Sequence, residues 1–240
     1  MILALDAGNT RIKWGLHDGN TWQAKGWVAV ADGAGLVDAW KGQIAPERIM
    51  ASNVAGSQVA RQIEEACQGW PARIEWVVAA ENQCGVRNGY EIPSQLGSDR
   101  WAALIAARAI APEGCVVVNA GTAMTVDALT ADGVFLGGLI VPGLATMLRA
   151  LTENTAALGE GGGHYRDIPQ NTSDAVYSGA LSAMAGAVWR MNALLAGKIE
   201  RAPTCLLSGG DARLLLPLLS GKARMVDNLV LDGLIRIAWA

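Results

Sequence analysis

The chain contains short apolar runs that end in turns of small residues, and two of these runs are alike. Residues 1–5 are apolar and lead into Asp-Ala-Gly-Asn-Thr at 6–10, and residues 115–118 lead into Asn-Ala-Gly-Thr-Ala at 119–123. The two turns are separated by about half of the 240 residues. A repeated pattern of this kind predicts a duplicated α/β architecture with one turn in each half.

Each turn is followed by a pattern typical of antiparallel strands. Residues 11–16 alternate between polar and apolar side chains, which is the period of a half-buried strand. Asp18-Gly19 is a hairpin signal that leads to a third strand at 22–30. The second half repeats this plan, with strands at 115–119, 124–129 and 134–140 and a hairpin signal at Asp132-Gly133.

Segments with helical periodicity alternate with further short strands. In residues 56–68, for example, Val59, Ile63 and Cys67 recur at the spacing of one helix face. Alternation of strands and helices indicates the α/β class, with mixed sheets flanked by helices. The remaining predicted elements are helices at 35–41, 144–151, 172–195 and after Asp211, strands at 48–53, 73–79 and 204–207, and a last apolar segment at 229–239.

The two halves are not separated by a linker or a low-complexity tract. We therefore expect two domains, residues 1–112 and residues 113–240, packed closely about a shared cleft. A chain of this length can bury a substantial core in each of them.

Composition narrows the functional classes. The net charge is −3 and no run of Lys or Arg occurs, which argues against nucleic acid as the main partner. The four cysteines are scattered and only two histidines are present, so a zinc site is not indicated and a reducing environment is expected. The apolar N-terminal run lacks a basic flank, and the longest uncharged stretch, residues 133–148, is too short to span a membrane. These features predict a soluble, cytoplasmic protein.

The two small-residue turns have the composition of phosphate-binding turns. A glycine after a strand lets backbone N–H groups approach an anion, and neighbouring Asn and Thr side chains add donors. Asp6, at the end of the first run, could hold a divalent cation that offsets phosphate charge. One such turn is more often an ordinary turn, but its repetition favours a grip on a nucleotide's phosphates from two sides. Neither a P-loop nor a Rossmann glycine pattern occurs in the sequence.

A third glycine cluster, Ser208-Gly209-Gly210-Asp211, follows a predicted strand and precedes a helix. Taken alone, it is explained by a plain strand-to-helix turn with Asp211 as the N-cap. In a chain with two phosphate turns, Gly209 and Gly210 become candidates to pack against the adenine or ribose of a nucleotide.

Asp99 and Arg100 stand at the start of an apolar helix between the two halves. In a structural interpretation, Asp99 caps this helix and Arg100 is a solvated surface charge. In a functional interpretation, Asp99 accepts a proton from a substrate hydroxyl, and Arg100 holds a substrate anion with its forked donors. Residue spacing does not choose between the two interpretations.

The motifs along the chain are Asp6-x-Gly8-Asn9-Thr10, Gly97-x-Asp99-Arg100, Gly121-Thr122-Ala123 with Asp127, Gly137-Gly138 through Pro142-Gly143, and Asn171-Thr172 with Gly179. Together these motifs resemble the type III pantothenate kinases. The order and spacing of the motifs make the combination specific, and the resemblance covers nearly the whole chain. The family implies an actin-like (ribonuclease H-like) fold, a homodimer, and transfer of the ATP γ-phosphoryl group to the 4′-hydroxyl of pantothenate, the first step toward coenzyme A.

The resemblance also implies roles for individual residues. Asp99 would be the general base, Arg100 would anchor pantothenate, and Thr172 would reach the pantothenate site of the partner subunit. Asp6 would hold Mg²⁺, and Asp127 would hold a monovalent cation, K⁺ or NH₄⁺. Further residues that would line the pantothenate pocket are Tyr90, Gly97 and Ser98. The residues that would contact ATP are Asp6, Gly8, Asn9, Thr10, Arg11, Lys13, Gly121, Thr122, Gly209 and Gly210.

The chain departs from the family in one place, and two other functions stay open. Many members carry an acidic residue where this chain has Asn119, so its second turn has one carboxylate fewer, which we interpret as tuning of metal dependence. One alternative function is an actin-like kinase for another small anionic hydroxylated substrate. The other is a non-catalytic regulatory or accessory protein on the same fold. An assay of ADP release with pantothenate discriminates among the three.

Overall fold

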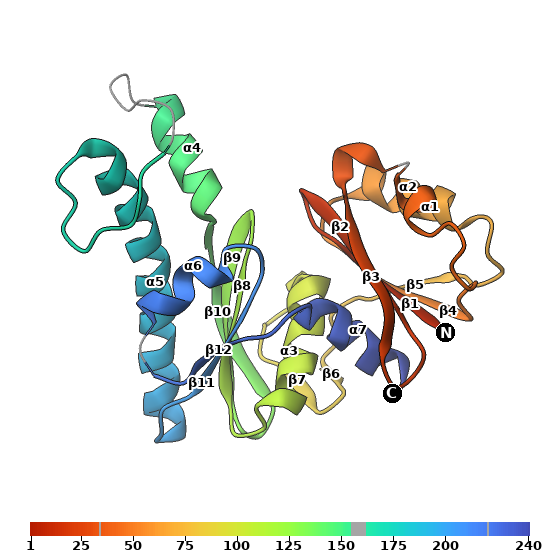
Figure 1. Cartoon of the computed structure of the whole chain (residues 1–240). Helices are drawn as coiled ribbons and strands as arrows, with labels where there is room; N and C mark the ends of the chain where they lie inside the picture. Colours follow the sequence, from red (N-terminus) through yellow and green to blue (C-terminus); the bar gives the residue numbers. More distant parts are fainter. Residues whose placement is uncertain (34, 155–161, 220) are drawn as a thin grey trace. The chain divides into compact units, whose positions relative to one another are not determined.

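The computed structural model forms two compact units (Figure 1). Unit 1 comprises Met1–Ile110 and Asn228–Ala240, and unit 2 comprises Ala111–Asp227. The division into domains at residues 1–112 and 113–240, expected from the sequence, stays a prediction. The compact units differ from these domains because the last helix packs within unit 1. The residues that the structure describes are 1–33, 35–154, 162–219 and 221–240.

Unit 1 contains a five-stranded sheet of order β3-β2-β1-β4-β5. β1 (Ile2–Ala7) pairs antiparallel with β2 (Arg11–His17), which pairs antiparallel with β3 (Trp22–Ala29). On its other side β1 pairs in parallel with β4 (Arg48–Asn53), and β4 pairs in parallel with β5 (Ile74–Trp76). The succession of strand, turn, strand, hairpin and strand that the sequence predicts is confirmed.

Two helices of unit 1 share a hydrophobic core with its sheet. They are α1 (Gly35–Ala39) and α2 (Ser57–Cys67). The side chains of Val59, Ile63 and Cys67 on α2 are buried in one cluster with residues of β1, β2 and β4. The face of α2 predicted from periodicity is therefore the face that it buries.

The last helix, α7 (Leu229–Ala238), packs against α3 (Ser98–Ile110). The two backbones approach closely, because a Cβ added at Gly233 would lie 1.9 Å from the carbonyl oxygen of Ala102. The sequence placed this segment in the second half, since apolar periodicity does not tell which sheet a helix covers. Elements that were not predicted in unit 1 are the 3₁₀ helices Val30–Asp32 and Pro93–Gln95 and the hairpin of β6 (Asn82–Gln83) and β7 (Val86–Asn88).

Unit 2 repeats the plan of unit 1. Its strands follow the order β10-β9-β8-β11-β12, with β8, β9 and β10 antiparallel and β11 and β12 added in parallel. The same order and directions occur in unit 1, which confirms the expected duplication. The bounds are β8 (Cys115–Ala120), β9 (Ala123–Leu129), β10 (Val134–Pro142), β11 (Thr204–Ser208) and the unpredicted β12 (Ala223–Met225).

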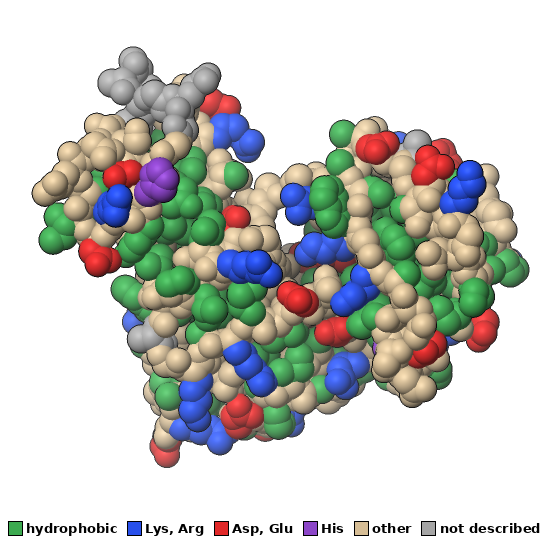
Figure 2. All heavy atoms as spheres, in the orientation of Figure 1, with side chains coloured by type: hydrophobic (Ala, Val, Ile, Leu, Met, Phe, Trp, Pro, Cys, Tyr) green, Lys and Arg blue, Asp and Glu red, His purple; other side chains and the backbone are tan. Residues whose placement is uncertain are grey.

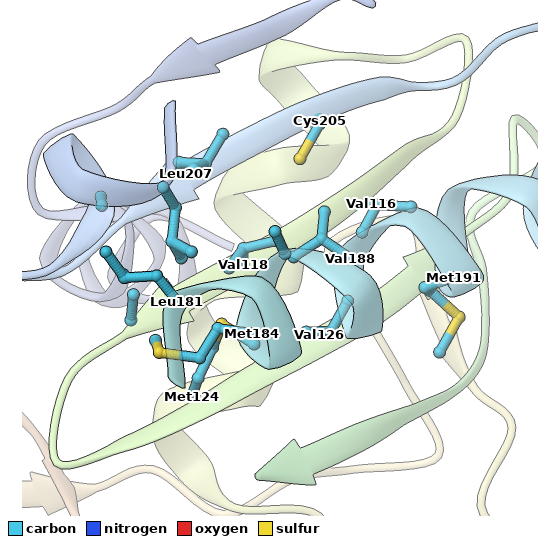
Figure 3. Packing of buried hydrophobic residues seen from close by; sticks show 14 of the residues in the cluster. Val116, Val118, Met124, Val126, Leu181, Met184, Val188, Met191, Cys205 and Leu207 are labelled. Carbon is cyan, nitrogen blue, oxygen red and sulfur yellow. The ribbon is translucent and has the colours of Figure 1, made fainter. Parts of the chain in front are cut away.

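The long helix of unit 2 covers one face of its sheet. Met184 and Val188 of this helix point toward Val118 and Val126 of the sheet (Figure 3), and all four side chains are buried. The long helix and the sheet therefore pack as two layers around one hydrophobic core. The helices are α4 (Leu144–Asn154), α5 (Thr172–Ile199), α6 (Ala212–Leu215) and the 3₁₀ helix Leu216–Leu218, of which α4 and α5 run past their predicted ends.

The structure also shows the charged surface and the state of the cysteines. On the face shown in Figure 2, Lys and Arg side chains are scattered among Asp and Glu and form no single basic patch among the described residues. All four cysteines are free thiols. In the part of the chain that the structure describes, no helix is both long and apolar enough to cross a membrane.

Candidate active site

The first small-residue turn stands at the end of β1. The N–H of Gly8 donates a 3.1 Å hydrogen bond to the carbonyl oxygen of Arg11, which closes the turn. Asn9 and Thr10 at its tip are exposed, whereas Asp6 at the strand end is only 7% exposed. The turn thus presents polar groups to solvent directly beside a buried carboxyl group.

The environment of Asp6 favours a nearby cation. Desolvation raises the pKa of this carboxyl group to about 6, while the charge of Lys13 lowers it and the charge of Asp99 raises it. Lys13 lies opposite Asp6 in the β1–β2 register. A buried carboxylate gains most from a positive charge close to it, so Asp6 fits the role of a cation ligand.

Arg11, predicted to contact ATP, stacks on an aromatic ring. Its guanidinium carbon lies 4.2 Å from the ring centre of Trp27 on β3. Both side chains are exposed, so this cation–π contact is a modest one. Of the two basic residues predicted for ATP in this segment, Lys13 is the one beside Asp6.

Asp99 is held in the first turn of α3. Its Oδ1 accepts a 2.8 Å hydrogen bond from the N–H of Arg100. Desolvation raises the pKa of Asp99, and the hydrogen bond and charge of Arg100 partly offset that rise. Gly97 leaves room for the carboxylate, because a Cβ at that position would lie 2.5 Å from Oδ1 of Asp99. A carboxyl group with a raised pKa and a fixed orientation is suited to accept a proton.

Arg100 is buried, so its interpretation as a solvated surface charge is wrong. The side chain is 6% exposed, and its Nη1 donates a 2.9 Å hydrogen bond to the hydroxyl oxygen of Tyr90. A guanidinium group needs polar partners when it is removed from water, and its forked donors match a carboxylate. Arg100 and Tyr90, both predicted for the same pocket, therefore lie together.

Asn88 supports Tyr90 and was missed in the sequence. Its Oδ1 accepts a 3.0 Å hydrogen bond from the N–H of Tyr90, and its Nδ2 donates to the carbonyl oxygens of Ala80 and Pro93 at 3.3 and 3.1 Å. The Asn-Gly pair at 88–89 is a turn signal, which could have indicated this role.

Ser98, predicted to line the pantothenate pocket, has a buried partner in the sheet. Its Oγ lies 2.9 Å from the Oγ of Ser52 on β4. Ser52 is fully buried and Ser98 is 8% exposed. Nothing in the sequence pattern around Ser52 pointed to this contact, which joins residues that are far apart along the chain.

The second small-residue turn belongs to unit 2 and is braced by the segment after β10. The N–H of Gly121 donates to the carbonyl oxygen of Ala123 at 3.1 Å. The carbonyl oxygen of Thr122 accepts hydrogen bonds from the N–H of Gly143 at 3.0 Å and from Oγ1 of Thr146 at 2.9 Å. Gly143 is sterically required, because an added Cβ would lie 1.8 Å from the carbonyl oxygen of Gly121.

The third glycine cluster meets the end of β8. Gly209 has a φ of +100°, and an added Cβ would lie 2.2 Å from the carbonyl oxygen of Ala120, which accepts a hydrogen bond from the N–H of Asp211. Gly209 therefore allows close backbone packing within unit 2. Gly210 is exposed, with no atom within 4 Å of an added Cβ. Asp211 occupies the N-cap position of α6, but its side chain makes no capping hydrogen bond, which corrects the expected cap.

The remaining predicted residues of unit 2 lie on its sheet and at the start of α5. Asp127 is 1% exposed on β9, and Asn119 is half-buried at the end of β8. Thr172 is exposed at the first position of α5, after Asn171, whose side chain accepts a hydrogen bond from the N–H of Asp174. Among the described residues, no group of three or more His, Cys, Asp or Glu side chains could hold a metal ion.

Two clusters therefore emerge, one in each unit. In unit 1, Asp6 and Asp99 are within electrostatic reach of each other. In unit 2, the second turn and Gly209 both adjoin the end of β8. A cavity of about 560 Å³ in unit 1, lined by residues such as Trp22 and Asp232, contains none of the predicted site residues.

The fold places the chain in a broad structural class. It superposes on a Baf family protein of Campylobacter jejuni with a TM-score of 0.63 and 21% identity, over 99% of this chain and 97% of that one. It also matches a candidate 2-dehydro-3-deoxygalactonokinase of Sinorhizobium meliloti, with a TM-score of 0.55 and 16% identity over 99% and 98% of the two chains. These likenesses define the actin-like ATPase and sugar-kinase fold, as the resemblance implied.

Sequence comparison then defines the family. The model of the type III pantothenate kinases matches residues 2–193. A curated type III pantothenate kinase of Nitrosospira multiformis is 51% identical over 99% of this chain and 91% of its own length. The chain belongs to the type III pantothenate kinase family, which confirms the resemblance drawn from its motifs.

Proposed function

We propose that this protein transfers the γ-phosphoryl group of ATP to the 4′-hydroxyl of pantothenate, with Asp99 as the general base. Membership of the family supports the reaction itself, an ATP-dependent phosphorylation that begins coenzyme A biosynthesis. One observation carries the residue assignment. The first turn of α3 presents the desolvated carboxyl group of Asp99 next to the buried guanidinium group of Arg100. A candidate general base and a candidate binding group for a substrate anion are therefore adjacent residues.

Asp99 orients the acceptor hydroxyl and takes its proton. Phosphoryl transfer needs little covalent chemistry from a protein, so alignment of the nucleophile is a large part of catalysis. The raised pKa of Asp99 makes the carboxylate a better proton acceptor than a fully solvated one. General-base assistance of this kind contributes about 10²–10⁴-fold to the rate.

Arg100 and Tyr90 bind the carboxylate end of pantothenate. Nη1 of Arg100 donates a hydrogen bond to the Tyr90 hydroxyl, and this bond fixes the orientation of the planar guanidinium group. Charge-assisted hydrogen bonds between Arg and a carboxylate are among the strongest in proteins. Gly97 belongs to the same proposed pocket, because only a residue without a side chain leaves room there for the Asp99 carboxylate.

Asp6 and the small-residue turns bind the nucleotide. The exposed Asn9 and Thr10 in unit 1, and the exposed Thr122 in unit 2, supply donors for the phosphates of ATP. Asp6 fits a Mg²⁺ ligand because its burial makes a neighbouring positive charge favourable. When bound, Mg²⁺ would neutralise charge on the phosphoryl oxygens. Further ATP contacts are proposed for Gly8, Arg11, Lys13, Gly121, Gly209 and Gly210.

Asp127 and Thr172 complete the proposal. Asp127, whose carboxyl group is buried on β9, is proposed to bind a monovalent cation, K⁺ or NH₄⁺, as the family resemblance implies. Thr172 is exposed at the start of α5, which is compatible with a contact to the pantothenate site of the partner subunit in a cytoplasmic homodimer.

The proposed function is tested by coupled detection of ADP release. The protein should form ADP with ATP, Mg²⁺ and pantothenate and should stop when pantothenate is omitted. Replacement of K⁺ by Na⁺ should slow the reaction, and Asp127→Asn should remove this difference. Turnover with other hydroxylated acids but not with pantothenate would contradict the substrate, and no ADP from any acceptor would favour a non-catalytic protein.

A further inference from the structure

Ser52 and Ser98 form a hydrogen bond that none of the roles above requires. The two Oγ atoms are 2.9 Å apart, Ser52 is fully buried, and Ser98 is 8% exposed. A hydroxyl pair of this kind exchanges bonds to water for one internal bond, so its net stabilisation is modest. Its place in the fold is therefore more informative than its energy.

The pair connects the two segments that carry the acidic residues of unit 1. Ser98 immediately precedes Asp99 in the first turn of α3. Ser52 on β4 lies beside Asp6 in the parallel pairing of β1 and β4. The hydrogen bond thus attaches the turn that bears Asp99 to the strand next to Asp6. In agreement, the charge of Asp99 acts on Asp6.

Two hydrogen bonds near Asp99 shape its turn without linking it to the sheet. The N–H of Trp101 donates to the carbonyl oxygen of Gly97 at 3.0 Å, and the N–H of Arg100 donates to the Asp99 carboxylate at 2.8 Å. Gly97 has no side chain with which to reach the strand. Arg100 and Trp101 of the same turn bond to Tyr90 and to Gln83 of β6, whereas Ser98 is bonded to Ser52 of β4, the strand beside Asp6.

We propose that Ser52 is a positioning residue for phosphoryl transfer, which acts by holding Ser98 and so directing the Asp99 carboxylate toward the acceptor hydroxyl. Ser98 has the same positioning role through its hydrogen bond to Ser52. The inference rests on the proposed function of Asp99 as the general base. A misplacement of a catalytic group by about 1 Å can lower the rate by about 10²-fold. Loss of this restraint should therefore lower kcat strongly and change the affinity for the substrate little.

The first test breaks the bond from either side in the full-length protein. Ser52→Ala and Ser98→Ala should each lower kcat by about tenfold to a hundredfold. The KM for pantothenate should stay within about threefold for Ser52→Ala, because the Ser52 hydroxyl is fully buried in the sheet and cannot reach the substrate. A rise in the pantothenate KM with an unchanged kcat would overturn the proposal in favour of a substrate contact.

The double variant separates positioning from stability. Each single variant leaves one buried hydroxyl without its partner, whereas Ser52→Ala with Ser98→Ala leaves none, so the double variant should regain thermal stability. Its kcat should stay as low as that of the single variants. Recovery of kcat together with the melting temperature would show a structural role only and would overturn the proposal.

Thr204→Val is the matched control for loss of a buried hydroxyl. Thr204 lies at the start of β11 in unit 2, and its Oγ1 donates a 2.9 Å hydrogen bond to the carboxylate of Glu113. The control should lose stability and keep its kcat. Asp99→Asn is assayed alongside. If it is active, the proposed role of Asp99 as the general base fails; if it is inactive while Ser52→Ala is fully active, only the inference about Ser52 fails.

Discussion

Nη1 of Arg100 lies 2.9 Å from the hydroxyl oxygen of Tyr90, and the guanidinium carbon lies 5.6 Å from the centre of the same ring. The two residues are ten positions apart in sequence, and the loop between them places the tyrosine against the start of α3. The hydrogen bond and the ring contact together orient the buried guanidinium group of Arg100.

Arg100→Lys tests the proposed role of this pair in binding pantothenate. Lysine keeps the charge but loses the planar fork, so it cannot hold Tyr90 and a carboxylate in the same way. Loss of a hydrogen bond to a charged group costs about 1.5–3 kcal/mol, so the KM for pantothenate should rise about tenfold to a hundredfold while the KM for ATP stays nearly constant. Steady-state kinetics measure both constants.

Tyr90→Phe should produce a smaller rise in the pantothenate KM, because it removes one contact of Arg100 and leaves the fork. Arg61→Lys on the exposed surface of α2 is the control and should have no effect. Equal constants for Arg100→Lys and the wild-type protein would show that Arg100 does not bind the substrate.

Asp6 should make the stability of the metal-free protein depend on pH. Its folded pKa of about 6 lies above the ordinary 3.8, so between these pH values the folded carboxyl group holds a proton that the unfolded chain has lost. The contribution to stability is therefore present below the lower value and is lost as the pH rises through the higher one. Above a pH of about 6, ionisation of the buried Asp6 carboxyl group lowers the free energy of unfolding by about 3 kcal/mol at most.

Asp6→Asn removes this penalty. In the presence of a chelator, urea unfolding should show that the variant is more stable than the wild-type protein at pH 7.5, with the difference shrinking toward pH 4. Asp38→Asn, on the exposed side of α1, is the control. If Asp6→Asn destabilises the protein equally at both pH values, the description of Asp6 as a desolvated carboxyl group is wrong.

Gly143→Ala should damage the second turn. The added methyl group would lie 1.8 Å from the carbonyl oxygen of Gly121, so backbone atoms have to move. Overpacking of this kind costs about 1–3 kcal/mol, and the KM for ATP should rise because the turn is displaced. Thermal unfolding and ATP titration measure the two effects.

Gly197→Ala is the matched control for this change. Gly197 lies inside α5 with no atom within 4 Å of an added Cβ. Alanine there should stabilise the protein by about 0.5–1 kcal/mol and leave the KM for ATP unchanged. A Gly143→Ala protein as stable and as active as this control would contradict the bracing of the second turn.

The sequence predicted what depends on neighbouring residues. The repeat of the small-residue turns predicted the duplicated sheets, and periodicity identified the buried face of α2. Asp6 and the Asp99-Arg100 pair were identified as candidates from the turn and the helix start in which they occur.

What the sequence did not predict depends on contacts between distant segments. The burial of Arg100, its bond to Tyr90 and the contact of Ser52 with Ser98 arise from tertiary packing, which a local pattern does not encode. The same reason explains the helix α7, whose partner α3 lies far away in the sequence.

The role of Asp99 as the general base is tested most directly by the kcat of Asp99→Asn. The amide keeps the size of the side chain but cannot accept the proton, so kcat should fall by about 10²–10⁴-fold while pantothenate still binds. Asp232→Asn is the control, because Asp232 is another carboxyl group of unit 1 with a pKa raised by desolvation and with a hydrogen bond from Trp22. We expect near-normal turnover for Asp232→Asn and almost none for Asp99→Asn. A kcat for Asp99→Asn close to that of the wild-type protein would show that Asp99 is not the general base.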